Sequence, residues 1–358
     1  MHDANGTQVL SSDLFAEAPV FLRQTMKAQE LIAAIEQTAI PAGAASWDKC
    51  GVQVAGRRHS VRSVAVALDP TLDTVERALA LGVDFILTHH PLSMKPRFLD
   101  SIDDHYRTVA ALIESKVWLY SAHTTLDANP EGPVSWLADE LALEERKLVE
   151  PTRLFEIESF AFTAPAAFDM QLLTAWAAEE GVENAIRNGD LIRVTCLQDK
   201  ASALRARIAN ELGEVPVFLA CPTQKPAALL GFGCIGTLPE PMTYDRFCDT
   251  LANVVERDYW VTSGHVPGTV STVAYCTGSG SSLADTAFRM GADVFITGDV
   301  KYHSALDAIG CLIDVGHFSL EEEMMRRFAM QLGESLPDLQ IFYLPAQDPM
   351  RLAVTGAR

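Results

Sequence analysis

The amino-acid sequence predicts an α/β protein made of two similar lobes, with a small α+β domain inserted between them. Short apolar segments alternate with amphipathic ones in residues 26–150 and again in residues 226–358, and this alternation is typical of α/β sheets. The two segments also resemble each other when one is laid over the other, which indicates an internal duplication. The segment 151–225 between them has a pattern of its own, and residues 1–25 are expected to form an N-terminal tail.

The first lobe begins with an amphipathic helix in residues 27–40, which is followed by a loop. Strands and helices then alternate, with strands expected at 63–69, 83–88 and 117–123 and helices at 72–82 and 106–116. The middle strand contains almost no polar residue, as expected when both faces of a parallel sheet are covered. Ligands of α/β proteins bind at the carboxyl ends of such strands.

An internal match supports the second lobe. Residues 61–90 align with residues 270–299 without a gap, at an offset of 209 and with seven identities in thirty positions. The next strand recurs at an offset of 194 and ends in His-x-x-x-acid in both halves, with His123 and Asp127 in the first and His317 and Glu321 in the second. We interpret the match as two related lobes with approximate two-fold symmetry. The alternative is that any two strand–helix–strand units look alike.

The segment 151–225 is predicted to contain a strand, a helix, a strand, a helix and a strand in that order. This order could form a small sandwich of the ferredoxin type. Its two ends would meet on the core of the protein, as they do in an inserted domain. None of its residues points to a chemical role.

Composition excludes several classes of function. The chain has 358 residues, of which 48% are hydrophobic, and its net charge of −19 argues against binding to nucleic acid or to anionic membranes. No apolar run approaches the ~20 residues of a membrane span, and the N-terminus lacks the features of a signal peptide. The seven cysteines form no CxxC pair, so we expect no disulfide framework and a cytoplasmic location.

Five side chains that follow strand ends are candidate metal ligands: His89, His90, Asp127, His317 and Glu321. Imidazoles and carboxylates together suit Zn, Fe, Mn, Ni or Co, and a catalytic zinc usually takes only three protein ligands. Five ligands therefore fit two divalent ions ~3.5–4 Å apart better than they fit one. Taken singly, each residue also has an ordinary interpretation, such as a helix cap for a histidine or a turn for Asp127.

Further residues are candidates for proton transfer and substrate binding. His123 and His303 could move protons, because imidazole titrates at a pH of about 6.5. A phosphate could be held by the segment CTGSGSS and by the nearby lysine, through Gly278, Ser279, Gly280, Ser281 and Lys301. The segment fits a flexible turn equally well, and it lacks the ending of a Walker loop.

Several motifs occur in the order and spacing of a known family, namely SWDKCGVQV, THHPL, YSAHTTLD, GSGSS, ITGDVKYH and DVGHFSLE. Over residues 27–150 and 226–345 the chain resembles the GTP cyclohydrolase 1 type 2 homologs, also called Ngg-one-interacting-factor-three-like proteins. The resemblance implies two α/β lobes, a ring-shaped homohexamer and a dinuclear metal centre whose ligands are the five residues named above. Lys49, Cys50 and Thr125 depart from the residues usual in the family, and Thr125 bears on the substrate pocket.

The family name implies hydrolytic opening of the imidazole ring of GTP, with release of formate. Two cations would lower the pKa of a water bridging them, and the resulting hydroxide could attack the purine C8. The same centre would serve a phosphoester or an amide, so a hydrolase of another substrate is an alternative. A non-catalytic protein that stores metal or acts as a scaffold is another. The expected partners are further copies of the chain and a nucleotide or other small phosphorylated substrate.

Overall fold

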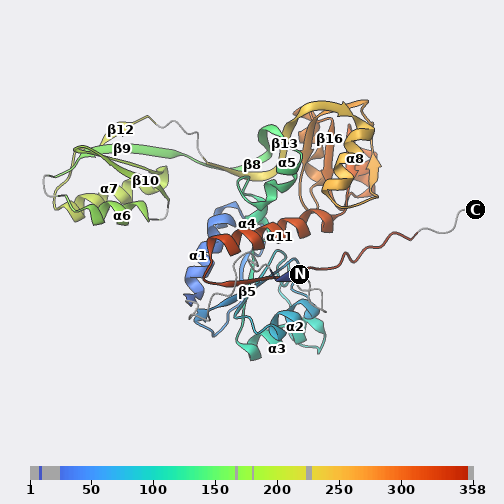
Figure 1. Cartoon of the computed structure of the whole chain (residues 1–358), viewed down its shortest axis with the longest axis horizontal. Helices are drawn as coiled ribbons and strands as arrows, with labels where there is room; N and C mark the ends of the chain where they lie inside the picture. The colour runs from blue at the N-terminus through green and yellow to red at the C-terminus, as the bar shows by residue number, and fades with distance from the viewer. Residues whose placement is uncertain (1–7, 10–24, 166–167, 180, 223–227, 354–358) are drawn as a thin grey trace, which may run out of the picture. The chain divides into compact units, whose positions relative to one another are not determined.

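The structure, a computed structural model, describes residues 8–9, 25–165, 168–179, 181–222 and 228–353 (Figure 1). The chain forms two compact units. The larger unit comprises Met1–Pro151 and Gly231–Arg358, and the smaller unit comprises Thr152–Leu230. Most of the expected N-terminal tail, residues 1–25, lies outside the described residues.

The first sheet of the larger unit has six strands in the order β1-β18-β5-β6-β7-β3. Their bounds are β1 Gln8–Val9, β18 Gln340–Tyr343, β5 Ser63–Ala67, β6 Phe85–Thr88, β7 Trp118–Ser121 and β3 Gly51–Val54. The four central strands are parallel, and β1 and β3 pair antiparallel at the two edges. Strands β5, β6 and β7 are buried throughout, because α2 (Leu72–Ala80) and α3 (Asp104–Ser115) cover one face and α11 (His317–Ser335) packs on the other.

The second sheet of the larger unit also has six strands, in the order β14-β17-β16-β15-β13-β8. Their bounds are β14 Val261–Ser263, β17 Cys311–Asp314, β16 Val294–Thr297, β15 Thr269–Tyr275, β13 Ala228–Thr243 and β8 Glu144–Phe155. Strands β15, β16 and β17 are parallel with antiparallel β14 beyond them, just as β5, β6 and β7 are parallel with antiparallel β3 beyond them. This shared order supports the internal duplication, which stays a proposal.

The two sheets share segments that the sequence assigned to opposite lobes. Strand β18 lies within residues 226–358 but joins the first sheet beside β5, and β8 begins within residues 26–150 but joins the second sheet beside β13. Helix α11 runs between the two sheets before the chain enters β18 (Figure 1). One buried core cluster therefore draws residues from both sheets and from α11, among them Val64, Ile313 and Met324.

Helix α11 is the longest helix among the described residues and carries an apolar stripe at a spacing of four. Leu320, Met324, Phe328 and Leu332 are all buried along this stripe. The indole of Trp136 donates a hydrogen bond to the carbonyl oxygen of Leu320 over 3.0 Å. The other helices and short elements of the larger unit are α1 Ala28–Thr38, α4 Thr124–Asp127, α5 Trp136–Glu140, α8 Tyr244–Val254, α9 Ala284–Arg289, α10 Tyr302–Leu306, the 3₁₀ turns η1 Pro41–Gly43, η2 Pro133–Ser135 and η3 Ser281–Leu283, and the strand pair β2 Met26–Lys27 and β4 Ser60–Val61.

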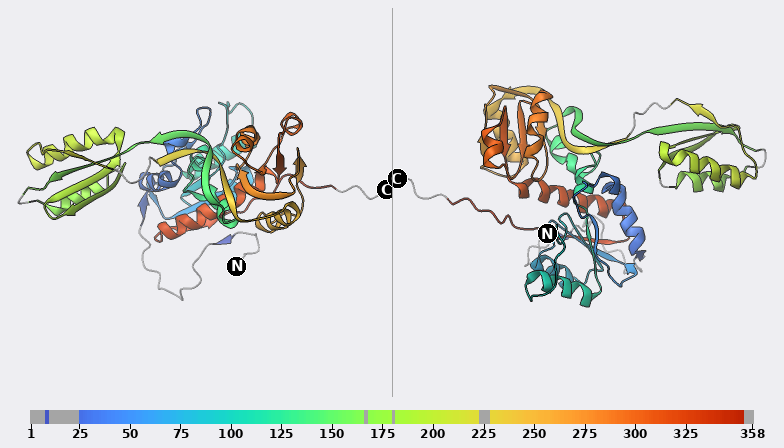
Figure 2. Two further views of the ribbon diagram at one scale, coloured as in Figure 1. Left: turned by 90° about the horizontal axis from the view of Figure 1, so that it is seen from above. Right: turned by 180° about the vertical axis from the view of Figure 1, so that it is seen from behind.

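The smaller unit contains one four-stranded sheet with two helices on one of its faces (Figure 2). Its elements are β9 Ile157–Thr163, α6 Met170–Ala177, β10 Val182–Asn188, β11 Leu191–Leu197, α7 Gln198–Leu212 and β12 Leu219–Cys221. The strand order β10-β11-β9-β12, antiparallel throughout, and the element order βαββαβ are those of a ferredoxin-like fold. The sequence-based order lacked β10, which alternates polar and apolar residues at the sheet edge and turns into β11 at Gly189.

The described helices are all too short or too polar to cross a lipid bilayer. All seven cysteines are free thiols, as expected from the absence of paired motifs.

Candidate metal centre

Four histidines of the larger unit follow the carboxyl ends of parallel strands. His89 and His90 come directly after β6, His123 follows β7, and His317 opens α11 after β17. Because neighbouring parallel strands end at one edge of a sheet, the rings of His89, His90 and His123 lie together, with centroids 5.0, 5.0 and 5.5 Å apart. The ring of His317, which comes from the second sheet, lies 5.4 Å from that of His90.

Each of these imidazoles is held by an acceptor at its Nδ1 atom. The acceptors are Asp69 for His90 at 2.7 Å, Asp48 for His123 at 2.8 Å, Asp299 for His317 at 2.7 Å and the carbonyl oxygen of Ala122 for His89 at 3.2 Å. An acceptor at this position keeps the proton of a neutral imidazole on Nδ1 and leaves the Nε2 lone pair for a metal ion. The geometry of all four rings therefore favours metal ligation through Nε2.

The Nε2 atoms of His89, His90 and His317 converge on the carboxylate of Glu321, which follows His317 by one turn of α11. Glu321 Oε2 lies 2.7 Å from His317 Nε2 and 3.1 Å from His90 Nε2. Its Oε1 lies 3.4 Å from His89 Nε2. One oxygen thus faces His89 while the other faces His90 and His317, an arrangement that suits a carboxylate shared by two metal ions.

Asp127 completes the set of five predicted ligands. Its Oδ2 lies 3.7 Å from His89 Nε2, and its Oδ1 accepts a hydrogen bond of 3.1 Å from the hydroxyl of Thr277. Two sets of three residues could each hold a metal ion, because the ligand atoms within a set all lie within 4.8 Å of one another. The first set is His89, His90 and His123, and the second is His90, His317 and Glu321. His123, which the sequence assigned to proton transfer, is therefore also in position to bind a metal ion.

A cation fits this cluster because buried lone pairs in it lack a hydrogen to accept. His89 is fully buried, and its Nε2 has no hydrogen-bond partner among the residues that the structure describes. Glu321 is only 3% exposed, and within the same residues its Oε2 also lacks a partner with hydrogen-bond geometry. Leaving such an atom unsatisfied costs about 1–3 kcal/mol, which a bound metal ion would offset. The donors suit Zn, Fe, Mn, Ni or Co.

In the metal-free protein, protons take the place of a cation in this cluster. Burial lowers the pKa of His90, but the hydrogen bond with Asp69 and the nearby carboxylate of Glu321 outweigh burial and raise the pKa to about 10. Burial also lowers the pKa of His317, and contacts with Glu321 and Asp299 raise it to about 9. Both imidazoles are therefore protonated on both ring nitrogens and positively charged at neutral pH, and a metal ion must displace the proton on Nε2.

We expect metal binding to release at least two protons per chain at pH 7, since His90 and His317 must each lose a proton before Nε2 can bind. The sign follows from pKa values above 7. Apparent affinity should rise with pH up to about pH 10, and proton release from these two residues should decrease from about pH 9 upwards. Calorimetric titration of the metal-free protein with Zn²⁺, in buffers of different ionisation enthalpy, measures the release. Equal heats in all buffers at pH 7 would contradict the expectation.

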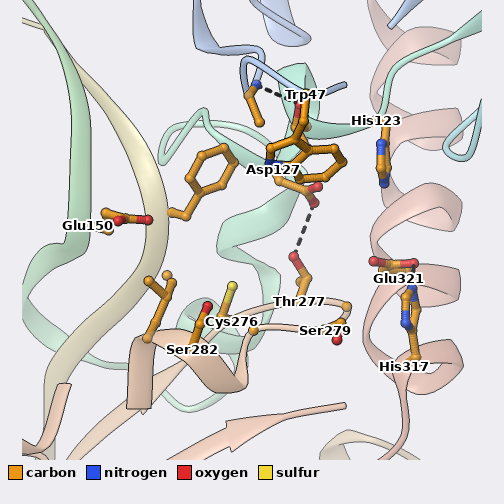
Figure 3. A pocket seen from close by; sticks show the side chains of 17 residues that line it. Trp47, His123, Asp127, Glu150, Cys276, Thr277, Ser279, Ser282, His317 and Glu321 are labelled. Atoms are coloured by element: carbon orange, nitrogen blue, oxygen red, sulfur yellow. Dashed lines mark hydrogen bonds and ion pairs between the residues drawn. The ribbon is translucent and has the colours of Figure 1, made fainter. Parts of the chain in front are cut away.

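A cavity of about 280 Å³ opens beside the cluster within the larger unit (Figure 3). Its lining includes four of the candidate metal ligands, namely His123, Asp127, His317 and Glu321. The other lining residues are Ala45, Trp47, Thr124, Glu150, Phe232, Gly233, Cys276, Thr277, Gly278, Ser279, Gly280, Ser282 and Leu283. A substrate bound in this cavity would therefore lie against the candidate metal centre.

The predicted substrate-binding residues fall into two groups. Residues 278–280 line the cavity, whereas Ser281, in η3, does not contribute to its lining. Lys301 and His303, at the start of α10, are exposed and do not line the cavity either. A substrate-binding role for Lys301 and a catalytic role for His303 therefore stay predictions, which the positions of the two residues do not support.

Sequence reasoning assigned no role to the carboxylates that orient the histidines. Asp69 follows β5, Asp299 follows β16, and Asp48 lies in the loop before β3. The available signal was positional, since Asp69 and Asp299 stand at strand ends like the ligands themselves. Trp47 and Glu150 were also missed, because neither lies at the end of a predicted strand.

Gly298 occupies the position in the second lobe that His89 occupies in the first. A Cβ atom at Gly298 would lie 2.3 Å from the backbone nitrogen of His317 and 2.5 Å from its Cα. We expect Gly298→Ala to lower the free energy of unfolding by about 1–3 kcal/mol and to weaken metal binding, because relief of the clash moves His317. Urea unfolding and a Zn²⁺ titration measure the two effects.

Gly333→Ala is the matched control for this substitution. Gly333 also belongs to the larger unit, but a Cβ there meets no atom within 4 Å and the residue lies inside α11. Its replacement should leave metal binding unchanged and raise stability slightly, by about 0.4–1 kcal/mol. If both alanine variants unfold alike, the contact at Gly298 does not constrain His317.

The fold and the site together define an α/β protein whose larger unit gathers histidines and carboxylates into a candidate metal centre. A family model described as Duf34/NIF3 (NGG1p interacting factor 3) matches residues 26–349, so the chain belongs to this family. The family expected from the sequence motifs and the mixed α/β fold class are thereby confirmed.

Individual relatives agree with this assignment. A protein of Halalkalibacterium halodurans named GTP cyclohydrolase 1 type 2 homolog is 28% identical over 351 residues, covering 87% of this chain and 93% of that protein. The crystal structure of a Bacillus cereus protein related to NIF3 matches with a TM-score of 0.75 at 22% identity, covering 92% of this chain and all of that one. A Staphylococcus aureus structure matches with a TM-score of 0.69 at 24% identity, covering 92% and 99% of the two chains. At these identities the two structures show the fold alone.

Proposed function

We propose that the protein is a metal-dependent hydrolase that holds two divalent transition-metal ions in this centre. The observation that carries the proposal is the position of Glu321, whose two carboxylate oxygens face different imidazoles. His90 and His317 lie near one oxygen of this carboxylate. His89 lies near the other oxygen, and its Nε2 also faces the carboxylate of Asp127. The five donor residues predicted from the sequence already exceed what a single ion usually takes from a protein.

When bound, the two ions would supply a water of lowered pKa and would stabilise negative charge on the reacting group. The side chains of the protein have separate tasks around them. Thr277 orients Asp127 by donating a hydrogen bond to its carboxylate. His123 lines the cavity with its Nδ1 held by Asp48, so its Nε2 can take or give a proton near a bound substrate.

The metal content tests the centre directly. We expect about two transition-metal ions per chain in gently purified protein, by elemental analysis, since the donor set suits a two-ion site. The double variant His89→Ala/His317→Ala should lose both ions, because it removes one imidazole from each side of Glu321. No bound metal in the native protein, and none taken up on reconstitution, would overturn the proposal.

Turnover tests the reaction. The metal-loaded protein should hydrolyse a member of a panel made of GTP, phosphoesters and amides, and Asp127→Asn should abolish this turnover even where metal is retained. Full metal occupancy without turnover on the whole panel would instead favour a protein that stores metal or acts as a scaffold. GTP as the substrate and a homohexameric assembly stay predictions from the family resemblance. Light scattering measures the number of chains in the assembly.

A further inference from the structure

We propose that the cavity beside the metal centre binds a planar, amino-substituted heteroaromatic ring that carries no phosphate inside it. Trp47 would provide the stacking surface for this ring, and Glu150 would accept hydrogen bonds from its amino edge. The inference rests on the proposed function in one respect, because it assigns the ring to the substrate of the hydrolase. Three observations carry it: the exposure of Trp47, the charges that line the cavity and the position of Glu150.

Trp47 is far more exposed than tryptophans in the core of the same chain. Its exposed fraction is 60%, against 8% for Trp118, 1% for Trp136 and 0% for Trp176. It lines the cavity and meets the ring of His123 at a centroid distance of 5.9 Å and an angle of 73°. An indole held in this way beside a ligand-sized cavity offers a stacking platform for a flat ring.

The charges around the cavity oppose a polyphosphate. Its described lining includes the carboxylates of Asp127, Glu150 and Glu321, but no lysine or arginine. Lys301, the residue expected to hold phosphate, does not reach the cavity. Phosphate groups would therefore find positive charge only at the metal ions themselves, whereas an uncharged or cationic ring meets no repulsion.

The glycine-rich loop is also poorly suited to cradle a phosphate. The N–H of Gly280 already donates a hydrogen bond of 2.9 Å to the hydroxyl of Thr297. The carbonyl oxygen of Gly278 accepts from Gly298 over 2.9 Å, which fastens the loop to the end of β16. A Cβ at Gly278 would lie 2.3 Å from Glu321 Oε1, so only glycine allows the loop to lie this close to the metal ligand. The loop thus acts as a wall of the cavity.

Glu150 supplies an acceptor on the side of the cavity away from the metal ligands. In Figure 3 its carboxylate lies across the drawn pocket from His317 and Glu321, with Trp47 along another side. A carboxylate can accept two parallel hydrogen bonds from an amino group and a neighbouring ring N–H. The cavity of about 280 Å³ lies just below the ~300–1,000 Å³ of sites for drug-sized ligands, so it suits one fused ring system.

The test is a calorimetric titration of the metal-loaded protein with guanosine and with inosine, which lacks the 2-amino group. Guanosine should bind about threefold more tightly than inosine, because only guanosine offers Glu150 an additional amino group, while the exposed carboxylate is hydrated when that group is missing. Trp47→Ala should weaken guanosine binding by at least about tenfold. Glu150→Gln should abolish the preference for guanosine over inosine. In EDTA-treated protein that also carries His317→Ala, GTP should bind no more tightly than guanosine, because both the metal ions and the imidazole that lines the cavity are then removed.

Two matched controls lie outside the cavity. Tyr302→Ala removes an aromatic ring that is 75% exposed on α10, and Glu131→Gln removes an exposed carboxylate. Neither should change the affinity for guanosine. The proposal is overturned if guanosine does not bind, or if Trp47→Ala binds it as well as the native protein. It is also overturned if GTP binds the EDTA-treated His317→Ala variant more than about tenfold better than guanosine does.

Metal analysis and hydrolysis assays on the same samples separate this proposal from the function it builds on. Guanosine binding that depends on Trp47 and Glu150, in a protein without turnover, would overturn the hydrolase and leave the ring site standing. Hydrolysis of a phosphoester or amide that is unaffected by Trp47→Ala would support the hydrolase and overturn the ring site.

Discussion

Glu321→Gln is expected to empty the metal centre almost completely. Burial raises the pKa of Glu321, but the charge of His89 and the close contacts with His317 and His90 hold it well below its usual range, so the group is ionised at neutral pH. Gln keeps the size of the side chain but removes the negative charge and one of two acceptor oxygens. Affinity for Zn²⁺ should fall by more than about 100-fold, the upper end for a residue that only supports a ligand.

Elemental analysis after dialysis against a weak chelator measures this loss. Glu323→Gln is the control from the same helix, because Glu323 pairs with Arg326 and Arg327 on the surface rather than with the histidines. It should retain the metal content of the native protein. A Glu321→Gln variant with full metal content would show that the carboxylate is not a ligand, and the shared position between His89 and His90 would then need another explanation.

The fold could be predicted from the sequence where strands are buried on both faces. Strands β5, β6 and β16 are continuous apolar runs that end in polar residues, and a run of this kind is hard to mistake. Strand β10 was missed because it alternates polar and apolar residues at a sheet edge, where burial is incomplete. The exchange of β8 and β18 between the sheets depends on long-range pairing that no local pattern reveals.

The candidate metal ligands were accessible to sequence reasoning for a similar reason. They stand directly after buried strands, or one helical turn later in the case of Glu321, so local patterns place them at one sheet edge. The residues that support them come from distant segments. Asp48 reaches His123 across 75 positions of the chain, and the cavity joins Trp47 to Glu150 from separate segments. Such contacts are created by tertiary packing and leave little trace in the local sequence.

Asp48→Asn is expected to lower turnover by at least about 100-fold while the metal ions stay bound, because it reverses the tautomer of His123. The Asp48 side chain is fully buried. Its Oδ2 accepts hydrogen bonds from Cys50 Sγ and from the N–H and hydroxyl of Thr124, so an amide NH₂ group cannot take that place. The Oδ1 position has only one other donor, the N–H of Lys49, against three donors at Oδ2, so the NH₂ group is expected at the Oδ1 position. Nδ1 of His123 then has to accept, and the proton moves to Nε2.

Metal content measured beside turnover distinguishes this positioning role from a merely structural one. Burial raises the pKa of Asp48, but hydrogen bonds with His123, Cys50 and Thr124 hold it well below its usual range, so the native carboxylate orients His123 at every pH of interest. In Asp48→Asn turnover should fall while elemental analysis still finds the native metal content. Asp73→Asn, on the exposed first turn of α2, is the control and should keep both native turnover and native metal content. If Asp48→Asn loses metal in step with turnover, His123 acts as a ligand and not as the proton carrier.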